Sequence, residues 1–186
     1  MSKFHIFKRK DKLSGAKPEY TKKVVFDSET TGLNVNAGDR LIEIGAVELN
    51  DKDHPTGALF HVYINPQRDV PQEATKIHGL TTEFLKDYPT FNMIKDDFLK
   101  FIEGKELIAH NLPFELSFLN YELGFELPNK ATDTLMIAKK LFPEATNTLD
   151  SLCKRFRINI ADMPYKGALL DAYCLAGVYR KLMQIL

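Results

Sequence analysis

Cysteine is scarce in this sequence. Cys153 and Cys174 are its only two cysteines, and each falls in a segment whose apolar residues have helical spacing. Neither has a cysteine or histidine neighbour at the spacing that zinc ligands require. We therefore expect two reduced thiols in the protein core, and no zinc site that involves them.

Long apolar runs are also absent. The longest, such as residues 24–26 and 168–170, are interrupted by charged residues long before the ~20 apolar residues that a membrane span needs. Residues 1–12 carry charge but lack the apolar region and the small-residue cleavage site of a secretory signal. These absences predict a cytoplasmic protein without a membrane partner.

No charge of either sign dominates the whole chain, which has 25 basic and 25 acidic residues, but the charges are unevenly distributed. Residues 1–23 hold eight lysines and arginines against Asp11 and Glu19, so the other 163 residues carry 17 basic and 23 acidic groups. The sequence therefore predicts a basic N-terminal arm, residues 1–22, followed by one compact domain, residues 23–186. The arm either contacts nucleic-acid phosphates or a partner, or is a solvated tail, which general grounds favour.

The apolar pattern predicts three strands followed by alternating strands and helices. Residues 24–26 are a continuous apolar run typical of a strand buried on both faces, and an antiparallel meander continues through residues 41–49 and 59–64. The spacing after residue 66 predicts two further short strands, at residues 107–109 and 131–133. It also predicts helices at residues 71–77, 81–85, 91–102, from 113 onward, 134–142, 148–156 and 167–185. This order of elements predicts an α/β domain with a mixed sheet covered by helices.

The first candidate functional residues directly follow the buried run. Asp27 and Glu29 are two residues apart, and the period of a strand sends both carboxylates to the same side of the sheet. We expect the strand to end here and a turn at residues 30–32 to expose the acids, at the edge where α/β sheets place ligands. Two acids at this spacing are common by chance, and the ordinary alternative is a strand end that turns into solvent.

Glu115 and Asp171 are the other two candidate acids. Glu115 belongs to a helix that begins at Pro113, and it shares one face of that helix with Asn111 and Phe118. A glutamate in a first helical turn often only compensates the helix dipole. Asp171 stands in line with the apolar stripe of the last helix, where a buried charge is costly without a partner. Either a metal or another cation satisfies it, or it lies at the frayed end of the stripe.

Four carboxylates without cysteines or paired histidines form a hard oxygen donor set. Such donors suit Mg²⁺ or Mn²⁺ better than zinc. Two of these ions about 4 Å apart can activate a water molecule and stabilise the leaving oxygen when a phosphodiester is cleaved. The sequence therefore predicts a site for two Mg²⁺ or Mn²⁺ ions.

Six segments, taken in order, carry a resemblance to a known family: VVFDSETTGL, LIEIGAVEL, KIHGL, AHNLPFELSFL, NTLDSLC and KGALLDA. Together they resemble the DnaQ-like DEDD family of 3′-5′ exonucleases, and within it the proofreading domains of bacterial DNA polymerase III epsilon subunits. The resemblance extends from about Val24 to the carboxyl terminus. It implies a ribonuclease-H-like fold with a five-stranded mixed sheet, and a two-metal mechanism. Single-stranded DNA 3′ ends are then the expected substrate, and a DNA polymerase subunit the expected partner.

The resemblance also implies roles for individual residues. Asp27 would bridge both ions, Glu29 and Asp171 would hold the ion that activates water, and Glu115 would support the second ion. Seven further residues would contact or lie near the terminal nucleotide, namely Thr30, Thr31, Leu33, Ile77, His78, Asn111 and Phe114.

Two positions depart from the family pattern. The family usually has aspartate where this chain has Glu115, and the extra methylene is expected to shift the second ion or its waters without abolishing binding. The histidine that defines one subclass, five residues before the last aspartate, is replaced by Lys166. Lys166 is thus a catalytic candidate, but the role of general base does not transfer to it.

Two functions are compatible with these residues. The first is a metal-dependent 3′-5′ exonuclease that releases nucleotides from single-stranded or frayed DNA ends, with activity reduced by Lys166. The second is a degenerate exonuclease fold that binds nucleic acid or a polymerase. Asp27, Glu29 and Asp171 favour the first, because their mutual repulsion is a liability without a metal. An RNA-trimming exonuclease of the same fold is not separated from the first by the sequence.

Overall fold

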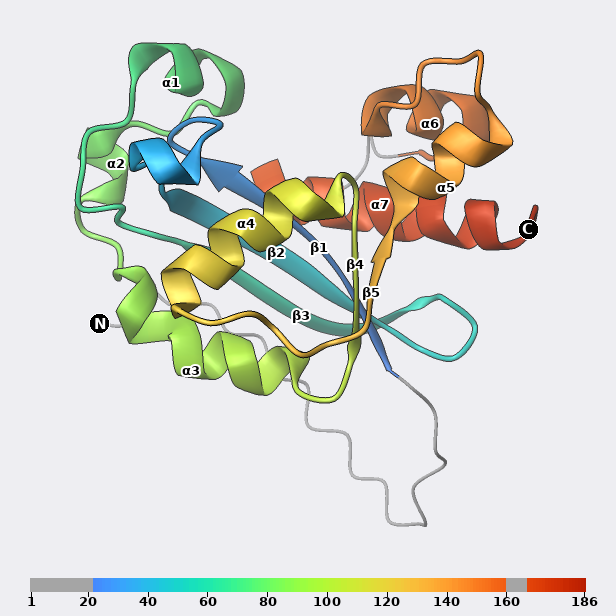
Figure 1. Ribbon diagram of the computed structural model, residues 1–186, viewed down its shortest axis with the longest axis horizontal. Helices are drawn as coiled ribbons and strands as arrows, with labels where there is room; N and C mark the ends of the chain where they lie inside the picture. Colours follow the sequence, from blue (N-terminus) through green and yellow to red (C-terminus); the bar gives the residue numbers. More distant parts are fainter. Residues whose placement is uncertain (1–21, 160–166) are drawn as a thin grey trace.

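A computed structural model describes residues 22–159 and 167–186, which form a mixed sheet with helices on both faces (Figure 1). The strands are β1 (Lys23–Thr30), β2 (Leu41–Leu49), β3 (Pro55–Tyr63), β4 (Glu106–Ala109) and β5 (Ala131–Asp133). β2 runs antiparallel to β1 and β3, whereas β4 runs parallel to β1 and β5. The order across the sheet is β3-β2-β1-β4-β5. The α/β class and the five-stranded mixed sheet are therefore confirmed.

Helices connect the strands and cover the sheet. They are the 3₁₀ helix η1 (Val35–Ala37) and the α-helices α1 (Gln72–His78), α2 (Thr82–Leu85), α3 (Phe91–Ile102), α4 (Leu112–Leu123), α5 (Thr134–Leu141), α6 (Leu149–Phe156) and α7 (Gly167–Met183). The bounds of the α-helices agree with the sequence prediction to within about two residues, the usual uncertainty of helix ends. Within the described ranges, no helix has the length and apolar character that crossing a membrane requires.

The central strand β1 contributes to a hydrophobic core on each face of the sheet. Val24 and Phe26 pack with α3 and α4 on one face, whereas Val25 packs with α5, α6 and α7 on the other. The second core also contains Cys153 and Cys174, which are buried free thiols as predicted. The apolar run at the start of β1 is continuous because neither face of this strand meets water.

Two strands are longer than the sequence pattern predicts. β1 continues to Thr30 because its residues 27–30 still pair with β2, so the strand ends one residue beyond the predicted end at residues 27–29. β3 begins at Pro55 and not at residue 59, because a tight turn brings Pro55 opposite Leu49. The side chain of Asn50 closes this turn by accepting hydrogen bonds from two backbone amides, at 2.9 and 3.1 Å.

The last helix, α7, packs across β1 and β2. At Gly45, in the middle of β2, the two elements approach so closely that a Cβ atom would lie 2.3 Å from the backbone nitrogen of Leu169. A glycine inside a strand often marks such a close approach of a second backbone. Gly45 therefore seats the first turn of α7 on the sheet.

We expect Gly45→Ala to lower the free energy of unfolding by about 2–3 kcal/mol, because the added methyl group forces α7 away from β2. Urea denaturation followed by circular dichroism measures this change. Gly57→Ala is the matched control: Gly57 also has a strand position, but nothing lies within 4 Å of its missing Cβ. Its positive φ of 90° makes the expected cost about 1 kcal/mol from the backbone alone. Equal losses in the two variants would contradict the close packing of α7.

Candidate metal centre

Three acidic side chains meet where β1 ends and α7 begins. Asp27 and Glu29 from β1 and Asp171 from α7 each offer one carboxylate oxygen, and these oxygens lie within 4.8 Å of one another. In the part of the chain that the structure describes, no other group of three acidic, histidine or cysteine side chains meets this criterion. Asp27 and Glu29 are two residues apart on a strand, and their side chains therefore point to the same side of the sheet, as predicted.

Asp171 reaches the sheet because it belongs to the buried face of α7. Leu175, Val178 and Leu182, which follow it at helical spacing, are completely buried. Asp171 is four residues inside the helix, which begins at Gly167, so it does not lie at a frayed end. Because these apolar residues pack against the sheet, the Asp171 carboxylate on the same face of α7 points toward Asp27.

Glu115 lies beside this cluster but is not one of its three members. It is in the first turn of α4 and is only 4% exposed. Its Oε2 accepts a hydrogen bond of 2.6 Å from the hydroxyl of Ser28, the residue between the two acids of β1. Ser28 thus ties the helix on one face of the sheet to the acids on the other.

Burial and mutual repulsion raise the pKa of each acid in the site. Burial, with help from neighbouring carboxylates, raises the pKa of Glu29 to about 7. Burial also raises the pKa of Glu115 to about 8, against the opposing effect of the Ser28 hydrogen bond. The pKa of Asp27 lies well above its usual range because Asp27 is buried and faces Glu115, Asp171 and Glu29. Without a counter-charge, the site retains protons that aqueous carboxylates would lose.

The donor set fits a hard divalent cation. All three clustered side chains offer oxygen, and neither a thiolate nor an imidazole is among them. Mg²⁺ and Mn²⁺ prefer such ligands, and a cation relieves the repulsion that raises the pKa values. The residues that would hold an ion are Asp27, Glu29 and Asp171, with Glu115 beside them.

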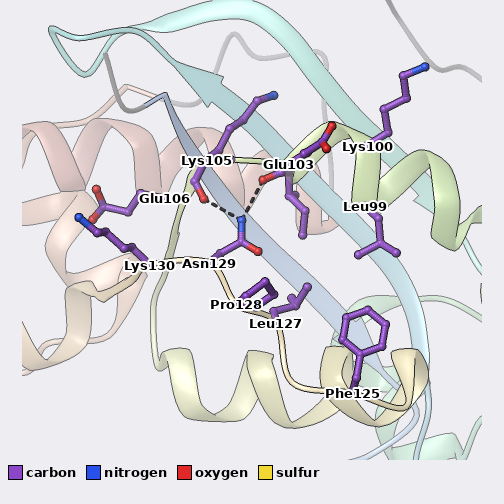
Figure 2. Close-up of a pocket in the computed structure, with 12 residues that line it drawn as sticks. Leu99, Lys100, Glu103, Lys105, Glu106, Phe125, Leu127, Pro128, Asn129 and Lys130 are labelled. Atoms are coloured by element: carbon purple, nitrogen blue, oxygen red, sulfur yellow. Dashed lines mark hydrogen bonds between the residues drawn. The ribbon is translucent and has the colours of Figure 1, made fainter. Parts of the chain in front are cut away.

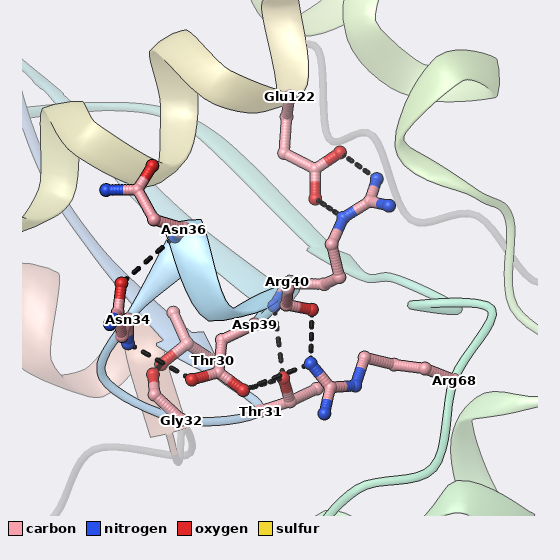
Figure 3. Close-up of polar contacts among 10 residues, drawn as sticks. Thr30, Thr31, Gly32, Asn34, Asn36, Asp39, Arg40, Arg68 and Glu122 are labelled. Atoms are coloured by element: carbon pink, nitrogen blue, oxygen red, sulfur yellow. Dashed lines mark hydrogen bonds and ion pairs between the residues drawn. The ribbon is translucent and has the colours of Figure 1, made fainter.

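Hydrogen bonds between its own residues stabilise the loop after β1 (Figure 3). The hydroxyl of Thr31 donates to Asp39 Oδ1 (3.1 Å) and accepts a hydrogen bond from the backbone amide of Arg40 (3.0 Å). The hydroxyl of Thr30 donates to a carbonyl of the same loop (2.5 Å). Leu33, by contrast, is 85% exposed. Both threonine hydroxyls are thus used inside the loop, and Leu33 is the large apolar side chain that the loop exposes to solvent.

The segment at the end of α1 lies near the same end of the sheet (Figure 1). Ile77 is 84% exposed. His78 Nδ1 accepts a hydrogen bond of 3.0 Å from the backbone amide of Leu80. Burial lowers the pKa of His78, whereas the charge of Glu43 and the backbone of Thr30 act in the opposite direction. His78 therefore lies within electrostatic reach of Glu43 and of Thr30, the last residue of β1.

Asn111 is not on the helical face predicted from its spacing. It precedes the first residue of α4 and is exposed, with a left-handed backbone at a φ of 71°. The left-handed backbone turns Asn111 out of the helix, so the prediction is wrong, and its backbone amide donates to the carboxylate of Asp133 (3.1 Å). Phe114 is partly buried and packs against Phe118, with ring centroids 5.0 Å apart.

Lys166 and residues 1–21 of the predicted basic arm lie outside the described residues. The catalytic role of Lys166, the arm and its boundary with the domain therefore stay predictions. So do the nucleotide contacts of the residues in the loop after β1, in α1 and around the start of α4.

One buried acid beside the cluster is missing from the sequence prediction. Glu43 in β2 is 1% exposed and pairs across the strands with Glu29. Its charge adds to burial in raising the pKa of all three clustered carboxylates. The available signal was an acid in the middle of the apolar segment LIEIGAVEL, because a buried charge requires a partner.

A cavity of about 660 Å³ lies elsewhere, between the end of α3, the start of β4 and the segment before β5 (Figure 2). None of the predicted site residues lines it. Glu106 on its wall pairs with Lys23 at the opposite end of β1 from Glu29. The Asn129 amide donates two hydrogen bonds, of 2.9 and 2.8 Å, to backbone carbonyls at the same wall. This cavity is therefore separate from the carboxylate site.

Sheet order, helix placement and the acidic cluster together define a nuclease of the ribonuclease-H-like class. The Exonuclease family model matches residues 24–179, and the chain belongs to this family. Among its curated relatives are DNA polymerase III epsilon subunits. The one from Rickettsia conorii is 48% identical over 171 residues, which cover 87% of this chain and 74% of the relative. The one from Escherichia coli strain K12 is 44% identical over 171 residues, which cover 86% and 70%.

Solved structures support the same fold. Exonuclease X in complex with 5′ overhanging duplex DNA has a TM-score of 0.72 and 24% identity, and covers 87% of this chain and 91% of its own. Product-bound exonuclease I has a TM-score of 0.71 and 18% identity, and covers 90% of this chain and 44% of its own. The ribonuclease-H-like arrangement of the sheet and helices is thus shared well beyond close sequence relatives.

We expect the stability of the metal-free protein to fall as pH rises from about 5 to 8. The pKa of Glu29 is raised from 4.5 when folded, so the native state binds more protons than the unfolded state in this window. A rise to about 7 corresponds to a loss of about 3 kcal/mol for this group alone. Urea denaturation in chelator at a series of pH values measures the slope.

Millimolar Mn²⁺ should oppose this loss, because the cation binds the deprotonated native site. Glu29→Gln should flatten the slope in chelator, whereas replacement of the exposed Glu103 by Gln should leave it unchanged. A stability profile in chelator that is level from about pH 5 to 8 would show that the carboxylates are not strained by burial.

Proposed function

We propose that this chain is a metal-dependent 3′-5′ exonuclease that releases nucleotides from single-stranded or frayed DNA ends. The observation that carries the proposal is the meeting of three carboxylates, Asp27, Glu29 and Asp171, within 4.8 Å at the end of the central strand. Membership of the Exonuclease family and identity to DNA polymerase III epsilon subunits support the same chemistry.

Each acid would have its own role in metal binding. Asp27, whose carboxylate feels the charges of Glu115, Asp171 and Glu29, would be shared by two Mg²⁺ or Mn²⁺ ions. Glu29 and Asp171 would complete the site of one ion. Glu115, oriented by Ser28, would support the second. Bound ions of this kind supply an activated water and charge stabilisation for the leaving oxygen. The apolar residues of β1 and α7 around these partly buried carboxylates would strengthen the charge interactions in the site.

The exposed apolar side chains near the cluster suit a terminal nucleotide. Leu33 and Ile77 project from the loop after β1 and from α1, and both are more than 80% exposed. Such side chains can pack on a base without selecting its sequence, as a proofreading site requires. His78 would approach the nucleotide from α1, while Thr30 and Thr31 hold the shape of the loop. Asn111 and Phe114 would line the α4 side of the nucleotide.

A DNA polymerase subunit is the partner that we propose, because the curated relatives named above are polymerase subunits. The basic residues of the N-terminal arm would either add phosphate contacts or remain in solvent. DNA is favoured over RNA because the curated relatives are subunits of a DNA polymerase.

The polarity and metal dependence can be tested with oligonucleotides labelled at the 3′ or 5′ end. We expect stepwise shortening from the 3′ end with Mg²⁺ or Mn²⁺ and none in chelator. Asp27→Asn should reduce kcat by more than about 100-fold, because it removes the ligand shared by both ions. Asp96→Asn, on the exposed face of α3, is the control and should cleave like the wild type. Cleavage from the 5′ end would contradict the proposed polarity.

Substitution of Lys166 tests whether the chain is an active or a degenerate enzyme. An ordinary lysine has a pKa near 10.4 and is a poor general base at neutral pH. We expect Lys166→His to raise kcat by about 100-fold at pH 7.5, the lower range of general-base contributions. Lys154→His, on the exposed face of α6, should change nothing. If wild-type protein and Lys166→His bind DNA but neither cleaves it, the degenerate, DNA-binding function replaces the enzyme.

A further inference from the structure

Glu43 lies directly behind the candidate metal centre. It is the third residue of β2, paired with Glu29 of β1 on one side and with Tyr63 of β3 on the other. Residues that are directly opposite in antiparallel strands point to the same face, so Glu43 faces α7, as Glu29 does. With 1% exposure, its carboxylate cannot be satisfied by solvent. Protein groups must therefore hold it.

His61 supplies the first of these contacts. Its Nε2 lies 2.8 Å from Glu43 Oε1, and it comes from the edge strand β3, where it pairs with Gly45. The histidine thus reaches diagonally from β3 to the carboxylate on the neighbouring strand β2. This contact restrains one of the two carboxylate oxygens.

The second oxygen of Glu43 faces the first residue of α7. A Cβ atom on Gly167 would lie 2.4 Å from Glu43 Oε2, so a larger residue would collide with the carboxylate. Gly45, two residues further along β2, makes the corresponding close approach to Leu169. Glu43 and Gly45 together form the surface on which the first turn of α7 rests. Asp171 lies one turn further along this helix.

We propose that Glu43, held by His61, is a positioning residue that sets the first turn of α7 so that Asp171 meets Asp27 and Glu29 at a cation. The inference rests on the metal-dependent function proposed above. Glu43 itself does not join the three-carboxylate group. Replacing a group that holds a metal ligand in its orientation typically weakens metal binding on the order of 10–100-fold.

The decisive pair of variants is His61→Phe and His61→Gln in the full chain. Phenylalanine preserves the bulk of the ring but cannot donate to Glu43, whereas glutamine can place a donor near the position of Nε2. We expect His61→Phe to raise the Kd for Mn²⁺, measured by isothermal titration calorimetry, about 10-fold. His61→Gln should restore it to near the wild-type value. In cleavage assays kcat of His61→Phe should recover at saturating Mn²⁺, with KM for DNA unchanged.

Glu43→Gln and Glu48→Gln separate positioning from general stability. Glu48 is a second buried acid of β2, held by Lys105 at 2.7 Å and remote from the site. Glu48→Gln should lower Tm and leave the Kd for Mn²⁺ unchanged, whereas Glu43→Gln should raise the Kd as His61→Phe does. If Glu43→Gln does not fold, the two His61 variants still decide.

An unchanged Kd for Mn²⁺ in His61→Phe and Glu43→Gln would overturn the positioning role while leaving the metal centre intact. Wild-type protein that binds no Mn²⁺ would instead overturn the metal centre, and the positioning role with it. Loss of affinity in His61→Gln equal to that in His61→Phe would also contradict the proposal, because the donor would then not matter.

Discussion

The carboxylates of Asp27, Glu29 and Asp171 repel one another inside the fold, and the surrounding structure must hold them together against that repulsion. Burial and neighbouring charge raise the pKa of all three. The unfavourable free energy of bringing them together is therefore offset by apolar contacts elsewhere in the protein, remote from the acids. A divalent cation changes the sign of the interaction, because it converts mutual repulsion into shared attraction.

The two hydrophobic cores supply the stabilising free energy. β1 is fixed between β2 and β4, and its apolar residues are buried on both faces before the first acid appears. α7 is fixed by Leu175, Val178 and Leu182, each of which contributes roughly 1.5–3 kcal/mol on burial. The acids thus lie near the ends of two rigid elements, β1 and α7. Neither element can turn its carboxylate toward solvent without exposing part of a core.

Local sequence patterns predicted these two elements because each pattern is contained in one segment. The apolar run before Asp27 and the stripe that contains Asp171 need no knowledge of a partner. The length of β1 and the conformation of Asn111 do depend on partners. Pairing with β2 extends the strand through Thr30, and Asn111 lies before the first residue of α4 in a left-handed conformation, with its amide bonded to Asp133. Neither partner is adjacent in the sequence, so no local periodicity contains the information.

Glu43 shows the same limit at the site itself. Every residue of β2 is buried, so alternation cannot tell which face each one occupies. Residue type does not separate Glu43 from Glu29 either, since both are acids in apolar strands that pair directly. The surroundings of the oxygens separate them. Those of Glu43 face His61 and Gly167, whereas Glu29 directs an oxygen toward Asp27 and Asp171. An acid whose oxygens both meet protein can hold a helix in place, and an acid with an oxygen turned to other carboxylates can hold a cation.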